Sequence, residues 1–179
     1  MARYVALLRG IMPSNPNMQQ AKLKGVMEAL GFTRVKPVLA SGNVVFDSSE
    51  RSAAALEAEM EAAWPKQLGF SSTTIVRSQS EIEKLVALDP YAGLEHGRTS
   101  YLLVTFFKRR AKLPFTVPFQ PEASWKIVSA ADRAIFSVID MTAKQVPNSM
   151  SWMDRTMGRD ITSRTWNTVL RIKAVMDRA

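Results

Sequence analysis

The stretch FTRVKPVLASGNVVFD, residues 32–47, decides the fold. Residues 32–39 and 44–47 are rich in β-branched and aromatic side chains, as strands are. Between them lies Ala40-Ser41-Gly42-Asn43, in which glycine and asparagine are typical of a turn. The stretch therefore predicts a β-hairpin.

The segments on either side of this hairpin extend it into a larger unit. Residues 3–9 are almost continuously apolar, which favours a strand buried on both faces. Apolar residues at helical spacing predict one helix that ends at Gly31 and a second over about 51–64, ended by Pro65 and Gly69. Residues 73–77 add a strand. The order β-α-β-β-α-β predicts a ferredoxin-like subdomain over residues 1–77, with two helices on one face of a four-stranded antiparallel sheet.

The second half predicts a weaker echo of the first. Its expected elements are a short helix opened by the capping box Ser78-x-x-Glu81, a strand at 101–107, an irregular proline-rich stretch at 113–121, a hairpin of 124–128 with 135–139, a helix after Pro147 carrying Met150, Met153 and Met157, and a last helix over about 164–177. We therefore predict the α+β class, with a degenerate second α+β subdomain over residues 78–179 packed with the first.

Composition excludes several classes of protein. The chain has 179 residues, of which 46% are hydrophobic and none is cysteine, so disulfides, thiolate nucleophiles and cysteine metal sites are excluded. The single His96 excludes histidine-pair metal sites, and we expect no cofactor. No apolar run approaches the roughly 20 residues of a spanning helix, and the start lacks a secretory h-region. We expect a cytoplasmic protein without membrane contact.

The charge is basic and uneven. The formal net charge is +8, and residues 98–179 carry 14 of the 24 basic residues but only 6 of the 16 acidic ones. Such asymmetry is typical of proteins that bind nucleic acid, phosphorylated metabolites or acidic partners, although an excess charge that serves only solubility is an equal alternative.

Three segments are candidate anion sites. The loop at 9–17 precedes a helix N-terminus, but its two prolines remove amide donors. In the predicted last helix, four polar residues fall within about 60° of one another and form one face: Arg164, Asn167, Arg171 and Arg178. The basic run 108–112, with Lys126 and Arg133, would contact phosphates rather than bases.

Two further kinds of site are disfavoured. An RNA-binding sheet needs exposed aromatic residues, and Tyr4 has no aromatic companions in Gly42-Asn43-Val44-Val45. The acidic residues Glu57, Glu59 and Glu61 could bind magnesium only if they converged, and helical geometry turns Glu59 away from the other two.

Three ordered blocks resemble one family: YVALLRGI at 4–11, SGNVVF at 41–46 and RTWNTV at 164–169. Together they resemble the bacterial domain of unknown function 1697 family across the whole chain. The resemblance implies a cytoplasmic bacterial protein with a ferredoxin-like α+β architecture, and it carries over no catalytic residue. Ten positions match the recurrent polar pattern of the family: Arg9, Gly10, Ser41, Gly42, Asn43, Lys144, Arg164, Trp166, Asn167 and Thr168. Met12-Pro13-Ser14 and Thr165 depart from that pattern.

These ten positions and Arg171 are the candidate ligand-binding residues. The leading hypothesis is that the protein binds a phosphate-bearing ligand or nucleic acid through Arg9, Lys144, Arg164 and Arg171. A second hypothesis is an enzyme acting on a small anionic metabolite, with Lys144 or Asp140 as acid or base. A third is a protein-interaction module, either a monomer or a weak homodimer formed through a sheet edge or the ten methionines.

Overall fold

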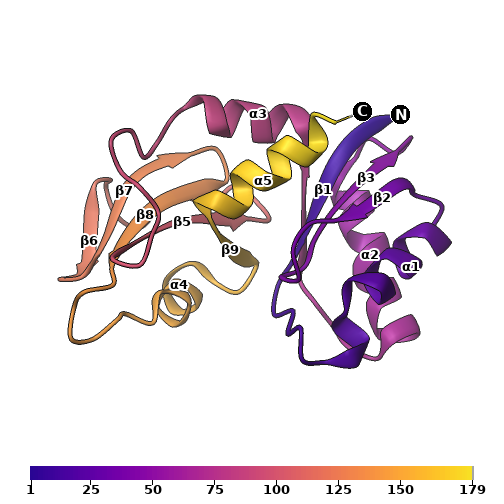
Figure 1. Ribbon diagram of the computed structural model, residues 1–179, viewed down its shortest axis with the longest axis horizontal. Coiled ribbons are helices and arrows are strands. Elements are labelled where there is room, and N and C mark those ends of the chain that lie inside the picture. Colours follow the sequence, from indigo (N-terminus) through magenta and orange to yellow (C-terminus); the bar gives the residue numbers. More distant parts are fainter. Residues whose placement is uncertain (179) are drawn as a thin grey trace. The chain divides into compact units, whose positions relative to one another are not determined.

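The computed structural model describes residues 1–178 and contains two antiparallel β-sheets and five α-helices (Figure 1). This confirms the predicted α+β class. The chain forms two compact units. Unit 1 comprises residues 1–84 and the C-terminal residues from Leu170 onward, and unit 2 comprises residues 85–169.

Unit 1 is built on a four-stranded sheet with the strand order β2-β3-β1-β4. Its elements along the chain are β1 (Ala2–Leu8), the 3-10 turn Pro16–Met18, α1 (Gln20–Ala29), β2 (Thr33–Pro37), β3 (Asn43–Ser48), α2 (Ala53–Leu68) and β4 (Thr74–Ser78). The predicted element order over residues 1–77 is therefore observed, and β2 and β3 pair as the antiparallel hairpin.

The alternation of β1 buries both faces of this sheet. Tyr4, Ala6 and Leu8 point into the core that α1 and α2 cover (Figure 1). Val5 and Leu7 face the other way and are also fully buried. A strand with both faces buried must be apolar throughout, which explains the continuous hydrophobic run at the start of the sequence.

Polar side chains from α2 bond the backbone of β4, which is an edge strand. Glu57 accepts a hydrogen bond from the backbone amide of Val76 (3.0 Å), and Glu61 accepts one from that of Thr74 (2.9 Å). The two carboxylates thereby occupy amide groups that would otherwise be open to another strand. Glu57 and Glu61 thus bind the backbone of the sheet. The described residues contain no cluster of potential metal ligands.

The helix-end signals are confirmed in one case and wrong in another. The capping box holds reciprocally: the Ser78 amide donates to Glu81 (2.8 Å) and the Glu81 amide donates to Ser78 Oγ (3.2 Å), opening α3 (Gln79–Ala87). Of the two residues predicted to end α2, Gly69 is confirmed, but Pro65 lies inside the helix, so the predicted end at about residue 64 is wrong. The helix continues to Gly69, whose φ of +75° closes it, because a proline in the last turns removes only one backbone hydrogen bond.

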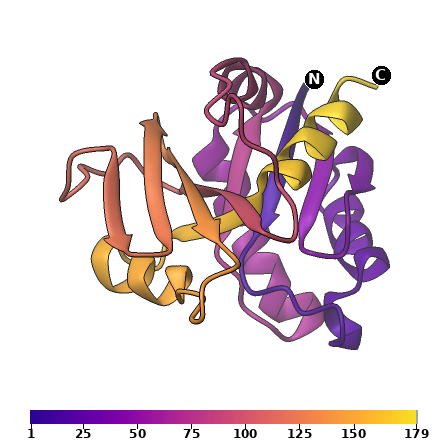
Figure 2. The same cartoon turned by 60° about the vertical axis from the view of Figure 1, so that its left-hand side comes forward.

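Unit 2 is built on a five-stranded sheet with the order β6-β7-β8-β5-β9. The elements are β5 (Ser100–Phe107), β6 (Phe119–Glu122), β7 (Trp125–Ala131), β8 (Ala134–Asp140), α4 (Ser149–Met157), β9 (Ile161–Thr165) and the start of α5 (Trp166–Met176). Helix α4 packs on one face of the sheet through Met153 (Figure 2). Trp152 of this helix packs edge to face on Trp125, with the ring centroids 5.2 Å apart.

Two strands of unit 2 escaped the sequence prediction. Strand β6 overlaps the end of the proline-rich stretch expected to be irregular, and it occupies an edge of the sheet, where a proline is tolerated. Residues 161–165 form β9, so Arg164 lies on a strand and not on the last helix. The reason is nonlocal, because β9 pairs with β5 and places Arg164 opposite Val104.

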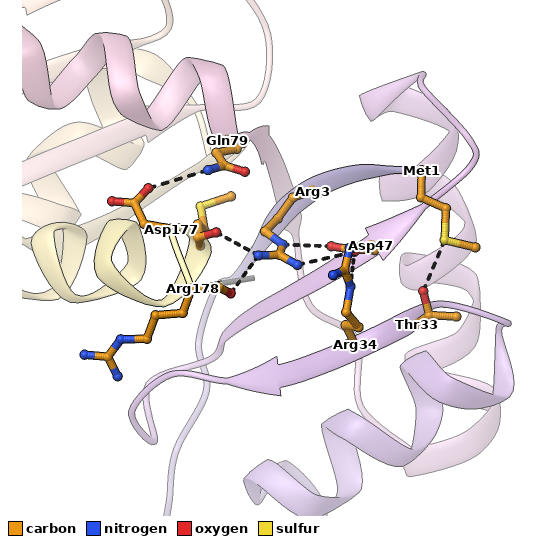
Figure 3. A network of polar contacts seen from close by, with 9 residues as sticks. Met1, Arg3, Thr33, Arg34, Asp47, Gln79, Asp177 and Arg178 are labelled. Carbon is orange, nitrogen blue, oxygen red and sulfur yellow. Dashed lines mark hydrogen bonds and ion pairs between the residues drawn. The ribbon is translucent and has the colours of Figure 1, made fainter.

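The C-terminal end of α5 returns to unit 1, where Arg3 holds it (Figure 3). The guanidinium of Arg3 donates to the carbonyl oxygens of Met176 (2.8 Å) and Arg178 (2.9 Å) and to the carboxylate of Asp47 (2.9 Å). Arg34 binds the same carboxylate from β2. The division of the chain therefore differs from the predicted boundary after residue 77, because the last residues complete the first unit.

No helix within residues 1–178 combines the length and the apolar character needed to cross a lipid bilayer.

Candidate functional site

Five of the predicted site residues gather at one end of the sheet in unit 1. The Leu8 amide, next to Arg9 and Gly10, donates to the Gly42 carbonyl at 2.8 Å. The carbonyl of Arg9 accepts a hydrogen bond from Ser72 Oγ (2.7 Å). The end of β1 and the β2–β3 turn are thus neighbours, although they lie more than 30 residues apart in the sequence.

Two members of this group have roles in the turn itself. Gly42 has a φ of +80°, and a Cβ there would lie 2.5 Å from Ile11 Cγ1, so only glycine fits. Asn43 is buried, and its side-chain amide donates to the Val38 carbonyl (2.9 Å) and to Ser41 Oγ (3.0 Å). The pattern Ser41-Gly42-Asn43 therefore has a structural basis whatever ligand the protein binds.

A second group lies where β9 meets α5, in unit 2. Arg164 is buried and donates to Thr162 Oγ1 (2.7 Å) and to the Ser163 carbonyl (2.8 Å). Burial lowers the pKa of Arg164 to about 10, so the guanidinium still carries its charge at neutral pH.

The neighbours of Arg164 anchor the start of α5. Trp166 is buried and packs edge to face on Tyr91, with the ring centroids 5.3 Å apart. Thr165 and Thr168 join their hydroxyls at 3.0 Å, and the Thr168 amide donates to Thr165 Oγ1. Asn167, in contrast, is exposed. The block thus supplies a packed junction with one outward amide side chain.

Lys144 lies apart from Arg164 within unit 2. It is exposed in the turn after β8, and the neighbouring Gln145 carbonyl accepts a hydrogen bond from Ser124 Oγ at 3.4 Å. Ser124 precedes β7, which lies three strand positions from β9, or about 14 Å at the usual spacing. The structure does not bring Lys144 and Arg164 together.

The environment of Asp140 disfavours acid–base catalysis there. Asp140 is exposed and accepts hydrogen bonds from the Thr142 hydroxyl (2.6 Å) and amide (2.8 Å), which hold the pKa of its carboxyl below the ordinary value of 3.8. Asp140 and Lys126 line a shallow hollow of about 320 Å³. An exposed, fully ionised carboxylate is a weak base at neutral pH.

A concentration of cations lies at one end of the sheet in unit 2, and we call it the basic end: residues 108–112, 132–133 and 159–160. Three contacts join these segments. The Phe107 amide donates to the Arg133 carbonyl (2.9 Å), the Lys108 amide donates to the Asp160 carbonyl (2.9 Å), and Arg110 pairs with Asp132 (3.0 Å). The basic end holds six cationic side chains and two carboxylates.

The basic end contains one residue that sequence reasoning missed. The run 108–112 and Arg133 were already candidates, whereas Arg159 was not. Arg159 reaches this end because β9 pairs with β5, matching Ile161 to Phe107. Arg159 could have been found from the sequence only if residues 161–165 had been recognised as a strand that pairs with β5.

The last candidate, Arg171, is exposed on the part of α5 that belongs to unit 1. It lines an open groove together with Arg178. The predicted helix face of four polar residues is thus reduced to Asn167 and Arg171, since Arg164 is on β9 and Arg178 lies beyond the end of α5.

Tyr4 and His96 both make contacts within the protein. Tyr4 is buried and stacks on Phe46, with centroids 5.7 Å apart, so it is not available to a nucleic-acid base. His96 accepts a hydrogen bond from the Leu102 amide through Nδ1 (3.1 Å) and packs on Tyr101. These contacts give the single histidine a structural role.

Comparison with known proteins supports the fold and the family. A solved structure of a conserved bacterial protein from Streptococcus pneumoniae matches with a TM-score of 0.70 and 22% sequence identity, covering 99% of each chain. A comparison with curated proteins found no match. The sequence profile described as protein of unknown function DUF1697 matches residues 1–136, which is most of the chain. The protein therefore belongs to the DUF1697 family.

Proposed function

We propose that the protein binds a phosphate-bearing ligand, with single-stranded or duplex nucleic acid as the first class to test, through the basic end of unit 2. We further propose that unit 1 is a ferredoxin-like module, on the basis of its element order and its strand order β2-β3-β1-β4. The observation that carries the binding proposal is the meeting of three cationic segments at one end of one sheet.

The charge balance at the basic end supports a polyanionic partner. The six cations exceed the two carboxylates by four charges within segments that backbone hydrogen bonds hold together. Arg109, Arg110, Lys112 and Arg159 are exposed. A polyphosphate backbone that meets such a cluster releases its condensed counterions, which favours binding at low salt.

The ion pair at the basic end does not oppose this partner. Arg110 and Asp132 are 82% and 57% exposed, so their interaction contributes at most about 1 kcal/mol. A phosphate can therefore replace Asp132 as the partner of Arg110 at little cost. The guanidinium fork then makes two charge-assisted hydrogen bonds to phosphate oxygens.

The basic end carries the proposal better than the residues first predicted from the sequence. Lys144 and Arg164 are separated in unit 2, and Arg164 is buried. Gly42 and Asn43 are explained by the geometry of their turn. Enzymatic acid–base chemistry receives no support from the exposed Lys144 and Asp140.

The test is a fluorescence-anisotropy titration of labelled 20-nucleotide single-stranded RNA, single-stranded DNA and duplex DNA, at low and near-physiological salt. The variant Arg109→Ala/Arg110→Ala/Lys112→Ala removes three exposed charges from the basic end. We expect it to reduce affinity at least tenfold and to make the slope of log K against log salt shallower by about 2 to 3.

The matched control is Lys22→Ala/Arg51→Ala/Lys66→Ala, which removes three exposed charges from unit 1. We expect its affinity to stay within about twofold of the original protein, since its charges lie outside the proposed contact. Equal losses in the two variants would show that net charge alone drives binding. Flat titrations for all three nucleic acids at low salt would refute a nucleic-acid partner.

A further inference from the structure

A groove of about 550 Å³ lies in unit 1 between the β2–β3 turn and the last helix. Its walls are Pro37, Val38 and Leu39 on one side and Leu170, Arg171, Ala174, Val175 and Arg178 on the other. All of these residues belong to unit 1. The groove is therefore independent of the basic end, which lies in unit 2.

The charge in this groove is uncompensated. Arg171 and Arg178 are exposed, and no carboxylate is among the lining residues. Arg171 lies on α5, and Arg178 lies two residues beyond the end of that helix at Met176. Both arginines therefore contribute positive charge to the lining of the groove.

Several other cations of unit 1 lie beside anions that the chain supplies. Arg3 and Arg34 share Asp47, and Lys173 pairs with Asp177 at 2.6 Å. In Figure 3 the side chain of Arg178 extends away from Asp47, while its carbonyl accepts from Arg3. Within the described chain, Arg171 and Arg178 are left for an anion from outside.

The apolar walls of the groove are also left uncovered. Leu39 and Leu170 are 37% and 40% exposed, and both line the groove. Leu39 has a φ of +59°, a left-handed conformation that costs a leucine roughly 1 to 2 kcal/mol. Residues held in unfavourable backbone conformations cluster at ligand-binding sites and switch regions.

We infer that this groove binds a small amphipathic carboxylate, with the carboxylate held by Arg171 or Arg178 and an aliphatic or aromatic body lying against Leu39 and Leu170. The volume falls within the range of small-molecule sites, which are mostly apolar with a few placed polar groups. The planar guanidinium matches the geometry of a carboxylate. A carboxylate also loses less hydration than a phosphate dianion when it enters walls that are largely apolar.

The probe for this inference is 4-phenylbutyrate, tested by saturation-transfer NMR and by amide chemical-shift mapping of the full chain. The neutral analogue 4-phenylbutanol has the same apolar body, and acetate has the same carboxylate. We expect 4-phenylbutyrate to bind, with shift changes concentrated in residues 37–39 and 170–178. Each analogue alone should bind at least fivefold more weakly.

Two variants of the groove and two controls sharpen the test. Arg171→Ala/Arg178→Ala should weaken 4-phenylbutyrate binding at least fivefold, and Leu170→Ser should weaken it with the charge intact. Arg51→Ala/Lys66→Ala removes the same charge elsewhere in unit 1 and should leave binding unchanged. The triple variant of the basic end should also retain it, which separates this inference from the proposed function.

Three results would overturn the inference. They are no binding of 4-phenylbutyrate to the original protein at 5 mM, an equal loss in the groove variant and its charge-matched control, and shift changes that map outside the groove. Thermal unfolding of each variant verifies that the fold is intact, and a variant that unfolds is replaced by Arg171→Gln/Arg178→Gln.

Discussion

Arg3 and Arg34 on the sheet of unit 1 differ from Arg171 on its last helix and Arg178 just beyond that helix, because the chain supplies an anion only to the first two. The first two enclose Asp47, whose side chain is 2% exposed. The second two line a groove without a carboxylate. The residue type is the same, so the surroundings decide whether an arginine holds the fold or is available to a ligand.

The net charge of the sequence does not show which arginines are available to a ligand. All four arginines contribute equally to the +8 of the sequence. The second pair adds more to the positive potential that a ligand meets, because Asp47 offsets part of the charge of the first pair.

The largest effect is expected where the enclosed anion is removed. Asp47→Ala leaves Arg3, whose side chain is 12% exposed, without its carboxylate, and should lower the free energy of unfolding by about 3 to 5 kcal/mol. Urea denaturation measures this. Asp132→Ala breaks an exposed pair and should cost at most about 1 kcal/mol. Similar losses of unfolding free energy in the two variants would contradict the distinction between the buried ion pair and the exposed one.

The next effect concerns the turn that carries Gly42. A Cβ at this position would lie 2.5 Å from Ile11 Cγ1 and 3.2 Å from Leu8 Cβ, in a backbone with φ of +80°. Gly42→Ala should therefore cost about 1 to 3 kcal/mol through overpacking and left-handed strain. Gly93→Ala, with no neighbour near its Cβ, shares the strain but not the clash. Unfolding curves that rank Gly93→Ala as the more damaging would contradict this account.

The pH dependence of stability tests the ionisation of the Asp47 carboxylate. Burial raises the pKa of Asp47, but hydrogen bonds and charge from Arg3 and Arg34 more than offset it, so the pKa lies below the ordinary 3.8. A depressed pKa in the folded state stabilises the protein above the unfolded pKa, and this contribution is lost as the pH falls through the folded pKa. The stability gap between the original protein and Asp47→Asn should thus be constant at neutral pH and shrink below about pH 4. A gap that widens in acid would reverse the assigned shift.

The smallest effect on stability is expected in the groove. Arg171→Ala/Arg178→Ala removes two exposed side chains without carboxylate partners, so the free energy of unfolding should change by no more than about 0.5 kcal/mol per site. The same variant should lose binding of 4-phenylbutyrate. Thermal denaturation measures the first quantity, and a large destabilisation would place these arginines with Arg3 and Arg34.

Local signals in the sequence predicted most of the elements. The capping box of Ser78 and Glu81, the turn at Gly42 and the spacing of Met150, Met153 and Met157 each depend on neighbours within a few residues. Strand β9 was missed because its pairing with β5 lies about 60 residues away. Polar residues at helical spacing dominated the local pattern there.

The candidate sites, like the strands and helices, could be predicted only where the signal is local in the sequence. Arg171 and the run 108–112 were found because they are cationic and locally patterned. The groove was not found, since Leu39 and Leu170 lie 131 residues apart and meet only in the folded chain. Asp47 was overlooked for the same reason, as its partner Arg3 lies 44 positions earlier.

The grip of Arg3 on the carbonyls of Met176 and Arg178 has a consequence for how the protein is made. The sheet of unit 1 is synthesised early, but the segment that Arg3 binds, around residues 176–178, is translated only after all of unit 2. At about 5 to 20 residues per second, residues 85–169 take roughly 4 to 17 s to synthesise, and unit 1 stays incomplete throughout. A nascent chain stalled before residue 170 would therefore expose part of its N-terminal unit to chaperones and proteases.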